Sequence, residues 1–176
     1  MSLFAAAEPR LWRENGFVDD DPWMIVEEAQ GALPEHAVLP LAGLLARISA
    51  GEALPQRLGV RLVADDDVSA LAPHLGVVSL VALTFRAFND GRAFSQASLL
   101  RERHGYGGDI RAIGDVLIDQ VALMLRCGVT SVLVSHPPTI RRLAEGRIGG
   151  IDQRYQPSAA PDAAHGSYSW RRRAVA

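Results

Sequence analysis

The sequence contains no lysine, and all 18 of its Lys-or-Arg positions are arginine. The chain therefore cannot form a lysine Schiff base with a carbonyl substrate, nor supply the lysine of a phosphate-binding P-loop. Its 176 residues carry a formal net charge of −2, so no strong overall field draws the protein to nucleic acid or anionic lipid. We expect neither nucleic acid nor a membrane among its partners.

Cysteine and long apolar runs are also scarce. Cys127 is the only cysteine, which excludes an internal disulfide and a four-cysteine iron–sulfur cluster built by this chain alone. The five histidines are scattered and not at metal-ligand spacings, so we expect no metal and no cofactor. Apolar runs stay well short of the roughly 20 residues of a membrane helix. We expect a cytoplasmic protein.

A repeated strand–helix rhythm fills most of the chain. Short apolar runs alternate with helical patterns, and these runs lie at residues 37–39, 59–64, 77–85, 109–113 and 130–134. Such repeats predict parallel strands joined by crossover helices. The sequence therefore predicts an α/β fold of about five βα units over residues 37–146. The sheet is either open and doubly wound or curved like part of a (β/α)₈ barrel.

The two ends of the chain differ from this rhythm. Residues 10–26 contain Asn15-Gly16 between apolar segments, a pattern that predicts a small antiparallel hairpin with a connection longer than two residues. Residues 151–176 contain two prolines, many small residues and three consecutive arginines at 171–173, which indicates an extended tail. We predict one α/β domain over residues 1–150, followed by this tail.

Polar residues cluster in residues 84–128, above all after the third and fourth expected strands. Ligands of parallel α/β folds bind beyond the carboxyl ends of the strands, where Asp90, Arg92 and Asp115 are expected. With Arg86, Arg92 forms a possible anion-binding fork, since guanidinium groups match oxyanions. The alternative is that Asp90 only stabilises a tight turn at residues 89–92 and that Arg92 is solvated.

The expected helix from Asp115 is apolar on most of its surface. Asp115, Asp119 and Arg126 fall on one narrow polar stripe at 100° per residue. The two carboxylates are candidate general acids or bases, as is Asp90. The alternative, which we favour, is a structural line of ion pairs that includes Arg126.

Charged and aromatic residues also crowd the end of the preceding helix. Arg101 and Arg103 either stabilise the helix C-terminus or bind a partner or anion, and Tyr106 either packs or is presented. Cys127 ends the long helix, where the helix dipole raises the pKa of a thiol, and we interpret it as a small buried side chain.

The segment 88–128 reads FNDGRAFSQASLLRERHGYGGDIRAIGDVLIDQVALMLRCG and resembles the signature of the DUF934 family of small bacterial proteins. The likeness extends over about residues 58–134. Positions that match the family pattern include Asp90, Arg92, Arg101, Glu102, Arg103, Tyr106, Arg111, Asp115, Asp119, Gln120, Arg126 and Cys127. This chain departs from the pattern at Leu133 and Ser135, where the family has a glutamate and an arginine.

The resemblance implies a role beside assimilatory sulfite reductase, since the family is commonly labelled a probable oxidoreductase of sulfite reduction. Three hypotheses follow. The first is an accessory protein of sulfur assimilation that binds the reductase or a small oxyanion. The second is an enzyme acting on an anionic substrate at the strand carboxyl ends. The third is a non-catalytic structural homodimer whose matched charges stabilise a shared edge, as the open edges of a half-barrel invite a partner.

Overall fold

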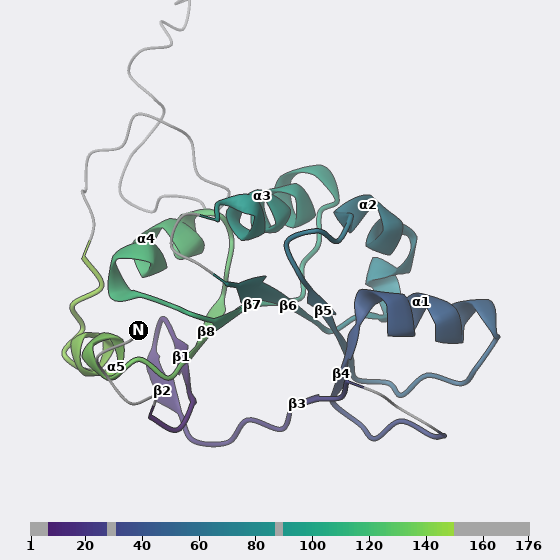
Figure 1. Cartoon of the computed structure of the whole chain (residues 1–176), viewed down its shortest axis with the longest axis horizontal. Helices are drawn as coiled ribbons and strands as arrows, with labels where there is room; N and C mark the ends of the chain where they lie inside the picture. The colour runs from purple at the N-terminus through teal and green to yellow at the C-terminus, as the bar shows by residue number, and fades with distance from the viewer. Residues whose placement is uncertain (1–6, 28–30, 87–89, 150–176) are drawn as a thin grey trace, which may run out of the picture.

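The computed structural model describes residues 7–27, 31–86 and 90–149. Asn89, in the expected turn, and the tail 151–176 lie outside these ranges. The described chain forms one sheet of eight strands in the order β2-β1-β8-β7-β6-β5-β4-β3 (Figure 1). The strands are β1 (Arg10–Arg13), β2 (Gly16–Val18), β3 (Met24–Ile25), β4 (Ala37–Pro40), β5 (Leu58–Leu62), β6 (Leu80–Phe85), β7 (Asp109–Gly114) and β8 (Ser131–Val134).

The six strands from β3 to β8 are parallel and lie side by side in chain order. Helices α1 (Leu41–Ser49), α2 (Val68–Leu71), α3 (Arg92–Ser98) and α4 (Ile118–Arg126) all cover one face of this sheet, as Figure 1 shows. Strands wound in one direction with helices on one face form a half-barrel. The α/β prediction is confirmed, and of its two architectures the half-barrel is the observed one.

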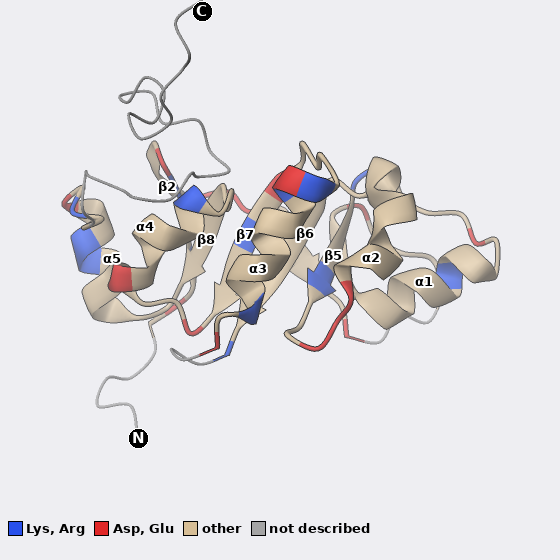
Figure 2. Ribbon diagram, turned by 90° about the horizontal axis from the view of Figure 1, so that it is seen from above, with Lys and Arg blue, Asp and Glu red and all other residues tan. Residues whose placement is uncertain are grey.

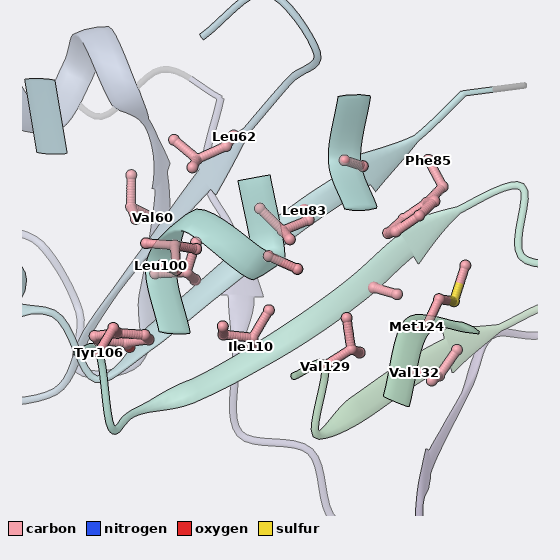
Figure 3. Packing of buried hydrophobic residues seen from close by; sticks show 14 of the residues in the cluster. Val60, Leu62, Leu83, Phe85, Leu100, Tyr106, Ile110, Met124, Val129 and Val132 are labelled. Carbon is pink, nitrogen blue, oxygen red and sulfur yellow. The ribbon is translucent and has the colours of Figure 1, made fainter. Parts of the chain in front are cut away.

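The main core lies between the sheet and these helices. Strand residues that point toward the helices, such as Val60, Leu83 and Phe85, pack against Leu100 and Met124 (Figure 3). The opposite, concave face carries a smaller apolar cluster of Val38, Leu80, Ala82 and Ile113. Because neighbouring residues of a strand alternate between faces, the same strands supply both cores.

The predicted hairpin within residues 10–26 is confirmed, but its connection is shorter than expected and its second strand is β2. β1 and β2 are antiparallel and joined by the two-residue turn Glu14–Asn15, after which Gly16 has a φ of +122°. β1 also pairs antiparallel with β8, so the hairpin extends one edge of the sheet. Residues 24–25, expected in the hairpin, instead form β3 at the other edge. The chain between them crosses the concave face (Figure 1).

One helix, the one expected from Asp115, begins later in the chain than the sequence indicates. Asp67 caps α2 by accepting from the Ser69 amide at 2.8 Å, and the following turn, η1 (Ala72–Val77), is 3₁₀. α3 begins at Arg92 and continues as one turn of π-helix, η2 (Leu99–Arg103). α4 begins at Ile118, because the amide of Asp115 is still bonded to the Phe85 carbonyl. The last helix is α5 (Pro137–Ala144).

Candidate functional site

The carboxyl ends of β5 and β6 are tied together by Arg92, the first residue of α3. Its Nε and Nη2 donate to the Asp90 carboxylate at 3.0 and 2.9 Å. Its Nη1 donates to Asp65, which follows β5. Asp90 also accepts from the Arg92 amide at 3.1 Å, which places both residues in one turn. Arg92 therefore links two loops of the rim, and Figure 2 shows the charged edge at which α2 and α3 begin.

The electrostatics of this group follow from its contacts. Side-chain and backbone hydrogen bonds from Arg92 lower the pKa of Asp90 to about 2. The same pairing raises the pKa of Arg92. Arg92 and Asp65 remain exposed, with 56% and 81% of their side-chain surfaces accessible. Asp90 and Arg92 are thus both charged at neutral pH, and Arg92 and Asp65 face solvent.

The other two candidate carboxylates, Asp115 and Asp119, are four residues apart in the chain but do not lie on one face of a helix. Asp115 follows β7, the neighbour of β6, and is exposed at the same rim. Asp119 is exposed in the first turn of α4, while Arg126 is in the last turn. Since Asp115 precedes the helix, it does not share a helical face with the other two.

Arg101 and Tyr106 lie at the opposite end of the strands, where β7 and β8 begin. Arg101 donates from Nε to the Gly128 carbonyl and from Nη1 to the Gly108 carbonyl, both at 2.9 Å. It also donates to the carbonyl of Tyr106, whose hydroxyl donates to Val78 O at 3.2 Å. Burial lowers the pKa of Arg101 and raises that of Tyr106. The structure therefore does not bring these two residues together with Arg92.

Arg103 lies away from both of these groups and lines a cavity of about 400 Å³ along α3 and the π-helical turn. Its lining includes Phe94, Leu99, Glu102 and Cys127. Burial raises the pKa of the Cys127 thiol, with a smaller opposing effect from a hydrogen bond to Ser98. A thiol of this kind is largely protonated at neutral pH, which argues against a nucleophile.

A family model described as a bacterial protein of unknown function (DUF934) matches residues 59–165. The chain belongs to the DUF934 family. No curated protein and no solved structure matches it. In the described part of this DUF934 protein, no group of three or more His, Cys, Asp or Glu residues is placed to hold a metal ion. None of its described helices has the length and apolarity to span a membrane.

Sequence reasoning missed the polar residues of the concave face in this DUF934 chain. Arg61 on β5 and Arg111 on β7 both point away from the helices, at positions between apolar neighbours. Arg111 is only 3% exposed and pairs with Asp21 at 2.7 Å. A charged residue inside an otherwise apolar strand is the signal that identifies such positions, because buried charges need partners.

Proposed function

We propose that the protein is an accessory protein of sulfur assimilation that acts with assimilatory sulfite reductase. The resemblance to the DUF934 signature supports a role in sulfur assimilation. The ion-paired rim is the surface that we propose contacts the reductase. The observation that carries the proposal is the contact of Arg92 with both Asp65 and Asp90. This contact joins Asp65 and Asp90 at the end of the half-barrel where proteins of parallel α/β architecture bind their ligands.

The chemistry of the rim favours binding over catalysis. With a pKa of about 2, Asp90 is a very weak base at neutral pH and holds no proton to donate. Arg92 already donates to two carboxylates, so its guanidinium group is engaged within the chain. A role in positioning an exposed surface uses both groups as they are observed.

The charge of the rim indicates the kind of surface it recognises. After β5, β6 and β7 the described rim carries five aspartates against two arginines, a net charge of −3; these residues are Asp65, Asp66, Asp67, Asp90, Asp115, Arg86 and Arg92. Complementary charge steers protein association and suppresses wrong partners. An acidic rim suits a basic patch on the reductase better than a free sulfur oxyanion.

A deletion strain grown on different sulfur sources tests the proposed pathway. Sulfate, sulfite and sulfide are supplied in turn as the sole sulfur source. We expect poor growth on sulfate and on sulfite and normal growth on sulfide, because the defect lies at the reduction of sulfite. Full growth of the deletion strain on sulfate would contradict the proposal.

Complementation tests the rim itself. The wild-type gene should restore growth on sulfate, and Arg92→Ala should restore it only in part, because the loops of Asp65 and Asp90 lose their common anchor. Arg142→Ala, at an exposed position of α5, is the matched control and should restore growth fully. Equal growth of the two variants, at equal protein levels, would show that the rim is not needed for growth on sulfate.

A further inference from the structure

Two arginines share one row across the concave face of the half-barrel. Arg61 on β5 is in register with Ala82 on β6, and Ala82 is in register with Arg111 on β7. The backbones of the two arginines are therefore two strand spacings apart, about 9.6 Å. Thr84, two residues beyond Ala82 on β6, points to the same face because side chains alternate along a strand.

Each of these three side chains has a buried polar atom without a hydrogen-bond partner in the described structure. The atoms are Nε of Arg61, Nη2 of Arg111 and the hydroxyl oxygen of Thr84. Arg111 is 97% buried, given its exposed fraction of 3%, and its Nη2 forms an ion pair with Asp109 at 3.8 Å but no hydrogen bond. Buried polar groups are nearly always satisfied, so three such atoms on adjacent strands are unusual.

Residues 19–27, here called the crossing segment, comprise the chain that crosses the concave face, β3 and the two residues after it. Carboxylates from this segment engage the outer ends of both arginines. Asp21 accepts from Nη1 of Arg111 at 2.7 Å. Glu27 accepts from both terminal nitrogens of Arg61, with Nη2 at 2.6 Å, and these bonds lower the pKa of Glu27. Between them, Trp23 packs near Gly59 on β5. The crossing segment thus presents anionic oxygens to the arginines of the concave face.

The Glu27 contact is the one most easily opened. Its side chain is 63% exposed, whereas that of Arg61 is 21% exposed. Exposed ion pairs contribute little free energy, because water competes for both charges. An external anion can therefore replace Glu27 on Arg61 at low cost, in the two-oxygen geometry that Glu27 already has.

We propose that the concave face binds a small oxyanion, of the class of sulfate, sulfite and phosphate, between Arg61 and Arg111. The anion replaces the Glu27 carboxylate on Arg61 and accepts from the Thr84 hydroxyl. Planar guanidinium donors and a hydroxyl are the groups that bind such oxyanions in proteins. This site lies on a different face from the acidic rim, so the inference does not depend on the proposed function.

Isothermal titration calorimetry on the full chain tests the site, with sulfate, sulfite and phosphate titrated separately against chloride at equal ionic strength. Glu27→Gln should tighten binding by about tenfold if the carboxylate occupies Arg61 nine-tenths of the time. Glu145→Gln is the matched control, because Glu145 forms an exposed ion pair with Arg147 elsewhere, and it should leave the affinity unchanged.

Two further variants separate binding from folding. Arg61→Gln should abolish binding. Thr84→Val keeps the shape of the side chain, removes a buried hydroxyl that has no partner, and should weaken binding about tenfold while the protein stays folded. Preference for the sulfur oxyanions over phosphate identifies the ligand as a sulfur species, and the reverse preference identifies a phosphate group. Either result supports the site.

Two results would overturn it. One is the absence of heat with every anion for both the wild type and Glu27→Gln. The other is equal affinity of the wild type, Thr84→Val and Glu27→Gln, which would place the anion elsewhere on the protein. The growth test of Arg92 reports on the rim alone, so the two proposals can fail separately.

Discussion

Arg92 donates from Nε and Nη2 to the two carboxylate oxygens of Asp90, the residue two positions before it. The same guanidinium group reaches Asp65, which is 27 residues away in the chain. A turn that is local in sequence is thus connected to the loop of the neighbouring strand. This connection joins the carboxyl ends of β5 and β6.

The first prediction concerns the pKa of Asp90. Because the folded-state pKa is about 2, below the ordinary 3.8, the Arg92 contact stabilises the fold fully above about pH 4 and is lost as the pH falls through 2. An NMR titration of the Asp90 carboxyl carbon should give a midpoint near 2, and in Arg92→Ala a higher midpoint that stays below 3.8, because the backbone amide of residue 92 still donates to Asp90. The same midpoint in both proteins would show that the contact is absent in solution.

Much of the half-barrel is predictable from the sequence, because apolar runs such as 77–85 and helix stops such as Gly128 are local signals. The pairing of β1 with β8 is not, since it joins residues more than a hundred positions apart. The sequence also places the start of α4 too early, at Asp115 instead of Ile118, because it does not show a contact with another strand. Asp115 is a good helix start by type, yet its amide bonds to Phe85 of another strand.

The candidate site was predictable only in part. The convergence of Asp90, Arg92 and Asp115 on one rim follows from the parallel sheet. The role of Arg101 does not, because its acceptors are backbone carbonyls on two loops that no sequence pattern identifies. The sequence also gives no reason to assign different roles to Arg101 and Arg103, because both are arginines two positions apart. In the structure Arg103 is exposed, whereas Arg101 is partly buried.

The second prediction compares these two arginines. Arg101→Met should lower the free energy of unfolding by about 2–4 kcal/mol, because three carbonyls lose a charged donor. Arg103→Met should change it by less than about 0.5 kcal/mol, as is usual for exposed positions. Urea unfolding followed by circular dichroism measures both values. Equal effects would show that Arg101 does not hold the loops together.

The third prediction concerns the packing of the crossing segment on β5. A methyl group on Gly59 would lie 2.9 Å from Val38 and 3.2 Å from the ring of Trp23, so Gly59→Ala should destabilise the protein by about 1–3 kcal/mol and shift Trp fluorescence. Gly43→Ala, in the helix α1, is the control and should be stabilising by roughly 0.5–1 kcal/mol, because its nearest contact is 3.8 Å away. Thermal unfolding measures whether each substitution lowers or raises the stability of the protein.

The fourth prediction concerns Cys127. Burial raises its pKa above the ordinary 9.0, so the reactive thiolate forms only at higher pH. Alkylation of the native protein by iodoacetamide should therefore be slow at pH 7.5, with a rate midpoint above pH 9. The same protein in urea should react faster, at the rate of a free thiol. Fast alkylation of the native protein would contradict the raised pKa of this half-buried thiol.

We propose that the acidic rim is the surface that meets the reductase, and a direct affinity measurement tests this proposal. Purified wild-type protein and the double variant Asp65→Asn, Asp90→Asn are titrated against assimilatory sulfite reductase at low and at high salt. We predict binding that weakens with salt, and a loss of about tenfold or more for the variant at low salt. No binding by the wild type, or equal affinity of the two proteins, would contradict the account.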